Sequence, residues 1–221
     1  MFRNITKKYK KFIQKNFMLT EIEGDSYDYN ILDSAVKQLS NPLGASFEIG
    51  VRRGMGSKII IDSYRKYHQN INELVHIGLD PYGNLPYTFS EIRKNTNDAD
   101  YTNLMKRETL INFFKKYPEF NFVNLDTYEY FKRFEDGYPI YNKQKKIIKN
   151  FEIVHFDGMH DLENVTFEVN YFLKHLCAQT IFIFDDIDTF DFDKIRKILI
   201  KNNFRDLESG ERKTSFEFRG N

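Results

Sequence analysis

Three carboxylates and two histidines lie within residues 153–165, IVHFDGMHDLENV, around the end of a short run of β-branched and aromatic residues. A second acidic group, FDDID at residues 184–188, follows a similar run. Carboxylate oxygens are the preferred ligands of Mg²⁺, and histidine is a common general base near neutral pH. The alternative is a solvated turn in which the acids cap a helix. The elements that position these residues must decide between the two.

Five short apolar runs, rich in Ile, Val and Phe, have the character of strands buried in a parallel sheet. Helical patterns lie between several of them, which predicts right-handed crossovers and helices on both faces. Residues 205–220 carry a glycine between two extended runs and predict an antiparallel hairpin. The expected fold class is therefore α/β, with a doubly wound, mostly parallel sheet. The five runs are residues 45–50, 74–80, 120–126, 151–157 and 180–186.

Two long connections interrupt this alternation. Residues 81–119 and 134–150 each exceed an ordinary crossover turn, so we expect them to form a lid or to cover a substrate site at the sheet edge. Within them, residues 95–100 are expected to form an exposed loop and residues 143–150 a basic surface helix. No linker is evident, and residues 1–221 are predicted to form a single domain.

Residues 1–40 are predicted to be a helical N-terminal extension. Within residues 1–20, six basic side chains and no acid accompany apolar residues at helical spacing. This basic amphipathic helix could lie on a membrane surface or an acidic partner, or join two copies of the chain in a homo-oligomer. The simpler alternative is a docking helix with one solvated lysine face.

The overall composition argues against several classes of protein. Lys and Arg number 33 and Asp and Glu 32, so no global positive charge favours nucleic acid. No apolar run approaches the roughly 18 residues of a transmembrane helix. The single cysteine, Cys177, excludes an internal disulfide framework and a multi-cysteine zinc site. We therefore expect a cytoplasmic protein with a small-molecule substrate, no nucleic-acid partner and no transmembrane segment.

Each predicted strand ends on a carboxylate or within two residues of one. Ligands of open α/β sheets bind outside the carboxyl ends of the strands, so these acids would meet at one edge. Helix capping explains one or two of them, because Asp is a good N-cap, but it explains all of them poorly. The acids are Glu48, Asp80, Asp126, Asp157, Asp185 and Asp186.

A glycine-rich turn, EIGVRRGMGS at residues 48–57, follows the first predicted strand and precedes a helical pattern. Its spacing, G-x-x-x-G-x-G, differs from the G-x-G-x-x-G of dinucleotide-binding folds. Glycines in such a turn allow the backbone to approach a ligand closely at the helix N-terminus. Asp80 ends the next strand, where an acid can accept hydrogen bonds from ribose hydroxyls. The acid strengthens the prediction of a ligand site at the turn.

These segments resemble the class I S-adenosylmethionine-dependent methyltransferases. Within that class the chain is most similar to the metal-dependent O-methyltransferases of the macrocin and mycinose sugar type and their uncharacterised relatives. The resemblance rests on residues 47–57, 77–86 and 153–165 and spans roughly residues 45–190. It implies a seven-stranded Rossmann-like methyltransferase sheet that ends in the C-terminal hairpin.

The resemblance also implies which residues hold S-adenosylmethionine. The glycine turn would cradle the amino-acid end of the cofactor, the acid after the second strand would hold the ribose, and the segment after the third strand would lie near the adenine. In that order, the residues are Glu48, Gly50, Gly54 and Ser57, then Asp80, then Asp126 and Thr127.

Asp157, Asp185 and Asp186 match the positions that bind magnesium in the family, and His160 matches a residue placed to act as a base. Neighbouring strands lie about 4.8 Å apart, so the ends of the fourth and fifth strands would face a common point. Mg²⁺ or Mn²⁺ held there would bind a hydroxylated small molecule, such as a sugar or another vicinal diol, and lower the pKa of its hydroxyl. His160 and Asp157 are the predicted catalytic residues of an O-methyltransferase.

Two other functions use the same residues. His155 and Asp157 form an H-x-D pair, which begins the two-histidine, one-carboxylate site of iron-dependent oxygenases. The second histidine would have to be His160 or His175, and neither lies on a distant strand. The other alternative is a protein that binds S-adenosylmethionine without catalysis.

Overall fold

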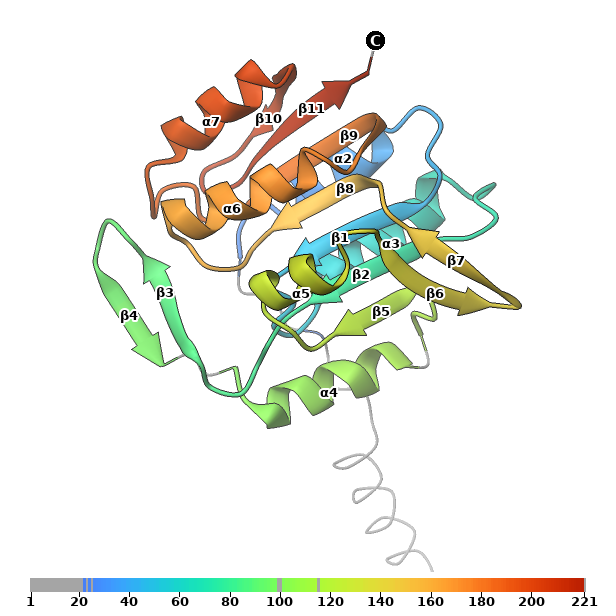
Figure 1. Cartoon of the computed structure of the whole chain (residues 1–221), viewed down its shortest axis with the longest axis horizontal. Helices are drawn as coiled ribbons and strands as arrows, with labels where there is room; N and C mark the ends of the chain where they lie inside the picture. The colour runs from blue at the N-terminus through green and yellow to red at the C-terminus, as the bar shows by residue number, and fades with distance from the viewer. Residues whose placement is uncertain (1–21, 23, 25, 99–100, 115, 221) are drawn as a thin grey trace, which may run out of the picture.

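The computed structural model describes residues 22, 24, 26–98, 101–114 and 116–220. Its centre is a seven-stranded sheet, drawn in Figure 1, with two short hairpins outside it. The sheet strands are β1 (Ala45–Ile49), β2 (Val75–Leu79), β5 (Phe120–Val123), β8 (Phe151–Phe156), β9 (Leu176–Phe184), β10 (Phe204–Ser209) and β11 (Thr214–Arg219).

The strand order across the sheet is β10-β11-β9-β8-β1-β2-β5. β11 pairs antiparallel with both of its neighbours, and the other pairs in the sheet are parallel. This order confirms the predicted doubly wound sheet with its C-terminal hairpin. The direction of winding reverses between β1 and β8, and ligands of such sheets bind in the crevice at this switch point.

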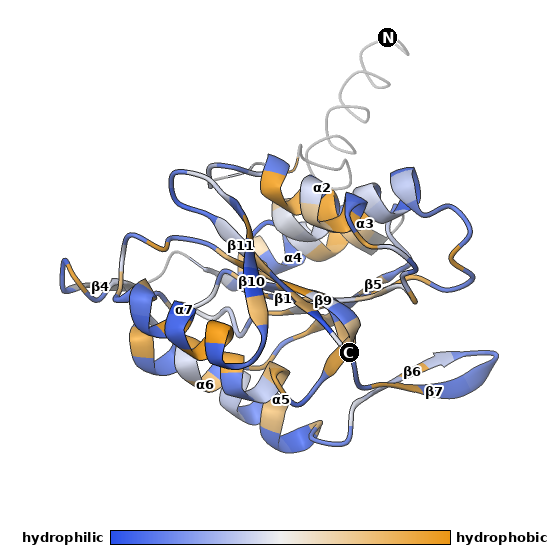
Figure 2. Ribbon diagram, turned by 90° about the horizontal axis from the view of Figure 1, so that it is seen from above, coloured by the Kyte–Doolittle hydropathy of each residue, from blue (hydrophilic) through white to orange (hydrophobic). Residues whose placement is uncertain are grey.

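Helices cover both faces of the sheet, as Figure 2 shows. Ile153 of β8 packs in the cluster beneath α2 and α3, whereas Val154 and Phe156 belong to the cluster beneath α5, α6 and α7. Successive side chains of a strand alternate between faces, so strands of almost continuous apolar sequence fill both layers. The helices are α2 (Asn30–Lys37), α3 (Met55–Tyr67), α4 (Asn103–Phe114), α5 (Thr127–Arg133), α6 (Leu162–Phe172) and α7 (Phe192–Lys201).

The larger core cluster is rich in aromatic rings. The ring of Phe47 on β1 forms edge-to-face pairs with the rings of Tyr130, Phe151 and Phe172, at centroid distances of 5.1, 5.3 and 5.0 Å. Edge-to-face pairs of this kind add roughly 0.5–1.5 kcal/mol each beyond their burial. These contacts join β1, β8, α5 and α6, the elements from which two sides of the switch point are built.

The two long connections form hairpins rather than the expected loop and helix. β3 (Pro86–Ser90) pairs with β4 (Asn95–Asp98), and β6 (Tyr138–Asn142) pairs with β7 (Gln144–Ile148). The expected basic helix at residues 143–150 is therefore wrong, as is the expected loop for residues 95–98. Cross-strand pairing and two adjacent isoleucines outweigh the helical propensity of the lysines in β7.

The segment before β1 belongs to the layer over the sheet. Four apolar residues of α2 are buried against α3, β8 and β9, namely Ile31, Leu32, Ala35 and Val36. The predicted basic helix at residues 1–20, and with it the predicted oligomer contact, lies outside the described residues. In the described part of the chain, no helix is long and apolar enough to cross a membrane.

Candidate active site

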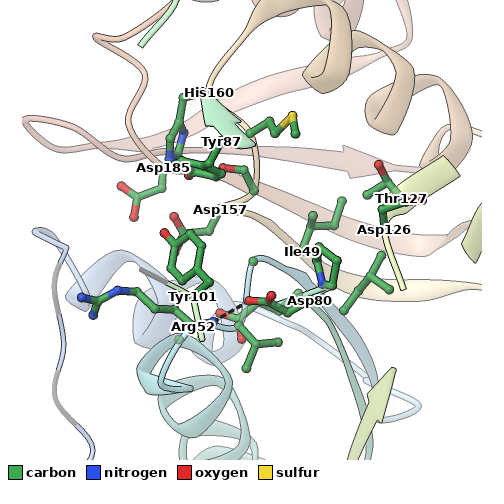
Figure 3. A pocket seen from close by; sticks show the side chains of 18 of the residues that line it. Ile49, Arg52, Asp80, Tyr87, Tyr101, Asp126, Thr127, Asp157, His160 and Asp185 are labelled. Atoms are coloured by element: carbon green, nitrogen blue, oxygen red, sulfur yellow. Dashed lines mark hydrogen bonds between the residues drawn. The ribbon is translucent and has the colours of Figure 1, made fainter. Parts of the chain in front are cut away.

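A cavity of about 530 Å³ opens at the switch point, within the range of small-molecule sites. One end is lined by the turn after β1, by Asp80 and by the start of α5. The other end is lined by the segments that follow β8 and β9 and by the β3 hairpin. Figure 3 shows Asp157 between the two ends. Most of the residues predicted for the cofactor and for catalysis therefore meet in one cavity.

The turn after β1 requires glycine where it approaches the β8 loop. Gly50 has φ +82°, and a Cβ atom there would lie 1.8 Å from the carbonyl oxygen of Asp157. Gly54 also has positive φ and directly precedes α3. Gly50 lines the cavity, whereas Gly54 and Ser57, two predicted cofactor residues, are not among the described residues that line it.

Glu48 anchors a buried polar network behind the glycine turn. The hydroxyl of Ser57 donates to Glu48, and Nδ1 of His155 lies 2.9 Å from Oε1 of Glu48. Nε2 of His76 lies 2.9 Å from the Ser57 hydroxyl oxygen. Although burial opposes ionisation, interactions with His155 and His76 lower the pKa of Glu48 to about 2. Ser57 thus supports Glu48, and Glu48 forms part of the cavity floor.

Asp80 lies at the wall of the cavity with only 5% of its surface exposed. Its two carboxylate oxygens accept hydrogen bonds of 2.9 Å from the backbone N–H groups of Arg52 and Tyr82. Burial raises the pKa of Asp80 to about 6 in spite of these bonds. A buried carboxylate at a cavity wall is stabilised by further donors, and the hydroxyls of a ribose are donors of the required kind.

The far side of this end is formed by the start of α5. Asp126 is the N-cap of α5 and accepts the backbone N–H of Glu129 at 2.8 Å, while the buried Thr127 begins the helix. Both residues line the cavity. Asp126 lies three residues beyond the end of β5, so it is a cap and not a strand end.

Glu168 is a cavity residue that the sequence analysis missed. It is 2% exposed, lines the cavity, and has its pKa raised to about 8 by burial and by the charge of Asp161. It lies on α6 between Val165 and Val169, on the buried face of this helix. An acid on the buried face of an amphipathic helix was the available signal.

The other end of the cavity gathers the predicted catalytic and metal residues. β8 pairs with β9, with Phe156 opposite Phe184, so Asp157 and Asp185 follow neighbouring strand ends. Nε2 of His160 lies 3.3 Å from Oδ2 of Asp186. Burial lowers the pKa of His160 to about 4, so its imidazole is neutral near pH 7.

The β3 hairpin closes this end from above. The Tyr87 hydroxyl donates to the carbonyl of Gly158 at 2.5 Å, and the backbone N–H of His160 donates to the carbonyl of Thr88. The ring of Tyr87 also meets the ring of His160 edge-on at 5.8 Å. The first long connection therefore touches the predicted site, whereas residues 134–150 contribute nothing to the described lining of the cavity.

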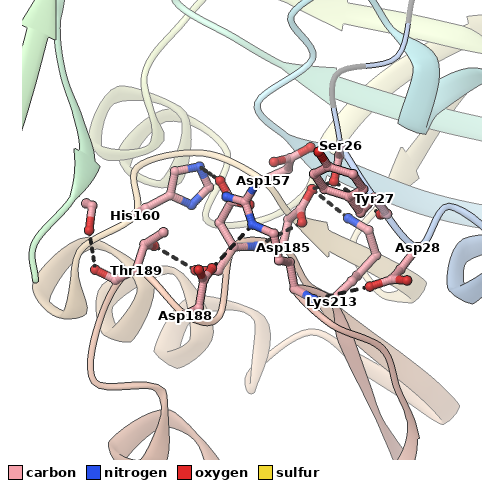
Figure 4. A network of polar contacts seen from close by, with 12 residues as sticks. Ser26, Tyr27, Asp28, Asp157, His160, Asp185, Asp188, Thr189 and Lys213 are labelled. Carbon is pink, nitrogen blue, oxygen red and sulfur yellow. Dashed lines mark hydrogen bonds and ion pairs between the residues drawn. The ribbon is translucent and has the colours of Figure 1, made fainter. Parts of the chain in front are cut away.

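Two basic residues of the C-terminal hairpin were not predicted at the site. The ammonium of Lys213 lies 2.6 Å from Oδ2 of Asp185, and the guanidinium of Arg212 lies 2.5 Å from Oδ1 of Asp186. Figure 4 shows this network, in which the hydroxyl of Ser26 also donates to Asp185. Because β11 is antiparallel to β9, the residues just before β11 meet those just after β9. Had the predicted hairpin been placed antiparallel to the fifth predicted strand, its turn would have been expected near Asp185 and Asp186.

The three aspartates do not fit a divalent cation in this arrangement. One oxygen of Asp185 faces the ammonium of Lys213 and the other accepts the backbone N–H of Asp186. The oxygens of Asp186 contact Arg212 and His160. An ion at the usual ligand distance of about 2.1 Å would add positive charge beside two cations.

A different group of three acidic or histidine side chains has ligand atoms within 4.8 Å of one another, in the part of the chain that the structure describes. It consists of Glu48, His155 and Asp157. Nδ1 of His155 already pairs with Glu48, and its Nε2 lies 3.2 Å from the ammonium of Lys213. The H-x-D iron site also needs a second histidine, but His160 pairs with Asp186, and His175 precedes β9 at the opposite end of the strands. The arrangement does not fit an iron site.

Comparisons with known proteins identify the fold. No protein-family model matches the chain, and no curated protein matches it by sequence. A putative caffeoyl-CoA O-methyltransferase from Staphylococcus aureus matches with a TM-score of 0.57 and 10% identity over 98% of this chain and all (100%) of the other. The calicheamicin methyltransferase CalS11 matches with a TM-score of 0.55 and 16% identity over 85% and 76% of the two chains.

An O-methyltransferase from Bacillus cereus in complex with S-adenosylhomocysteine (SAH) matches with a TM-score of 0.53 and 12% identity, over 96% of this chain and 97% of the other. The strand order, the position of the cavity at the switch point and the similar structures all indicate the same fold. The chain has the Rossmann-like fold of class I methyltransferases, as the resemblance predicted.

Replacement of Asp80 tests the cofactor end. We expect Asp80→Asn to weaken SAH binding at least about 10-fold, because hydrogen bonds to a charged acceptor contribute about 1.5–3 kcal/mol. Wild-type affinity should fall as the pH drops through about 6, where the Asp80 carboxyl gains a proton. Isothermal titration calorimetry with SAH between pH 5 and 8 measures both effects. Asp136→Asn, at an exposed position, is the control, and equal affinity of Asp80→Asn and wild type would contradict the assignment.

Glu168 makes stability depend on pH. Its pKa of about 8 in the folded state exceeds the 4.5 of the free side chain, so the unfolded chain loses this proton first as the pH rises. Stability from this group is therefore present below about pH 4.5 and is lost progressively up to about pH 8. We expect Glu168→Gln to be the more stable protein at pH 9, by at most about 5 kcal/mol, and similar to wild type at pH 5. Urea unfolding at the two pH values, with the exposed Glu163→Gln as control, checks the sign.

Proposed function

We propose that the protein transfers the methyl group of S-adenosylmethionine to a hydroxyl group of a small molecule. The single observation that carries this proposal is the continuity of the cavity. A nucleoside-compatible end with Asp80 and an acid-lined end with Asp157 open into the same space. The fold and the neighbours' names support the same class of reaction.

The residues of the first end are suited to hold the cofactor. Asp80 would accept the ribose hydroxyls, and the turn at Gly50 lets the backbone come close to the amino-acid end of the cofactor. Asp126, Thr127 and Glu168 would surround the base. When bound, S-adenosylmethionine supplies an electrophilic methyl group on a sulfonium centre.

The residues of the second end are suited to activate a hydroxyl. Asp157 lines the cavity between the two ends, where burial and the charge of Asp185 raise its pKa well above the usual range. In its ionised form it is therefore a stronger base than a free carboxylate, placed to accept the proton that the acceptor hydroxyl loses. Neutral His160 would hydrogen-bond and orient the acceptor, since its low pKa makes it a weak base. Tyr87 and the β3 hairpin cover this end and limit the access of water.

The proposed reaction does not include the predicted divalent cation, because two of its three predicted ligands have other partners. Asp157, Asp185 and Asp186 were predicted to hold Mg²⁺ or Mn²⁺. Asp185 is paired with Lys213, and Asp186 is paired with Arg212. In the proposed reaction, protein groups alone therefore bind the acceptor and take its proton. The acceptor is then held by hydrogen bonds, and a single hydroxyl group suffices.

The function is tested by binding and turnover together. Calorimetry should detect one molecule of SAH per chain, and incubation with S-adenosylmethionine and hydroxylated acceptors (sugars, sugar nucleotides, catechols) should release SAH. A chain that binds SAH but transfers no methyl group to any acceptor would support the non-catalytic alternative. A chain that binds no SAH would contradict the proposal.

Replacement of the proposed base separates catalysis from binding. We expect Asp157→Asn to lower kcat at least about 100-fold while SAH affinity stays within a few-fold of wild type, because the amide cannot accept the proton. Release of SAH measured against acceptor concentration gives kcat and KM separately. Asp193→Asn, an exposed acid on α7, should behave like wild type. Undiminished turnover in Asp157→Asn would assign the base elsewhere.

A further inference from the structure

We propose that Lys213 and Arg212 supply, from within the chain, the positive charge for which a divalent cation was predicted, so that the site works without a metal. The role of this charge in catalysis rests on the proposed function. The replacement of the ion by these two side chains does not rest on the proposed function, because it depends only on the charges and contacts of the described residues.

The position of Lys213 follows from the topology of the sheet. Thr214 at the start of β11 is paired with Phe184 at the end of β9, so Lys213 lies beside Asp185. The preceding turn is held from a distant part of the chain, because the carboxylate of Asp28 accepts the backbone N–H groups of Glu211 and Arg212 at 2.7 and 3.1 Å. Lys213 is thus placed by two independent segments.

Lys213 is a buried lysine whose ammonium group contacts a buried carboxylate. Its side chain is 0% exposed, and its ammonium lies 2.6 Å from Asp185 and 3.2 Å from Nε2 of His155. The ring of Tyr29 lies 5.9 Å from the ammonium. Burial of an unpaired ammonium or carboxylate is costly, and the contact between Lys213 and Asp185 gives each of these buried groups a partner.

Arg212 completes the replacement on the cavity side. Its guanidinium contacts Asp186 at 2.5 Å and Asp188 at 3.3 Å, and it lines the cavity. Two adjacent residues of one turn therefore neutralise the two adjacent acids after β9. Of the three acids predicted to hold the ion, Asp157 has neither of these two close cation contacts, and burial and the charge of Asp185 raise its pKa well above the usual range.

A divalent cation would compete with these groups for the same oxygens. Bound at about 2.1 Å from Oδ2 of Asp185, it would come within about 5 Å of the ammonium that contacts this oxygen. The like charges would repel each other in a buried place where screening is weak. Lys213 is therefore a positioning residue that holds the Asp185 carboxylate and keeps the ion out.

Mn²⁺ titration followed by electron paramagnetic resonance tests the proposal without any acceptor. The signal of free Mn²⁺ should be unchanged by wild-type protein. Lys213→Met should bind Mn²⁺ at least about 10-fold more tightly than wild type, because three carboxylates then face one arginine. Lys201→Met, which removes an exposed lysine from the end of α7, should behave like wild type. A purely structural role of Lys213 would not create a metal site.

One result overturns the proposal without Lys213→Met: wild type binds one Mn²⁺ per chain, and Asp185→Asn abolishes this binding. If Lys213→Met does not fold, the wild-type titration and Arg212→Met, a half-exposed position, decide in its place, with tighter Mn²⁺ binding by Arg212→Met expected. Arg212→Met that binds no more tightly than wild type would then count against the replacement. Failure of SAH binding would overturn the proposed function and leave the Mn²⁺ result standing, so the two failures are distinguishable.

Discussion

The close approach of two loops at the switch point is the constraint on which the site depends. The carbonyl oxygen of Asp157 lies where a Cβ atom of residue 50 would be, so the turn after β1 and the loop after β8 can meet only if residue 50 is glycine. This contact joins the end of the cavity with Asp80 to the end with Asp157, Asp185 and Asp186. Any side chain at position 50 would separate the two loops and move Asp157 relative to Asp80.

Charge balance is the second constraint, because the strand ends bring several carboxylates together in a poorly solvated place. The molecule uses a different solution for each. Glu48 is stabilised by histidines, Asp80 by backbone N–H groups, and Asp185 by a buried lysine. Glu168 avoids a buried charge instead, since its raised pKa of about 8 leaves it mostly protonated at neutral pH. Acids of similar sequence context therefore differ in charge state and in chemistry.

Local patterns in the sequence were sufficient to predict the sheet, and most of the predicted site residues line the cavity. Buried strands and glycine turns have short-range signatures, so β1, β8 and the turn at Gly50 were predictable, as was the hairpin at residues 204–219. The contacts that a side chain makes in the folded protein could not be predicted from such local patterns. Ser57 has the right spacing for a ligand contact but turns inward to Glu48, and Lys213 reaches Asp185 only through the pairing of β9 with β11. The helix predicted for the lysine-rich residues 143–150 was wrong for a different reason, because this segment pairs with the strand directly before it and the single-segment pattern does not show that pairing.

The C-terminal hairpin also gives the site an order of assembly. β10 and β11 follow every other sheet strand in the chain, yet their turn carries the counter-charges of Asp185 and Asp186. A nascent chain that has been made only as far as residue 209 contains the parallel strands and the acids but neither cation. Without Arg212 and Lys213, burial of the acidic pair would leave two unpaired carboxylates, which is costly, so the last strand removes a barrier to closing this end of the sheet.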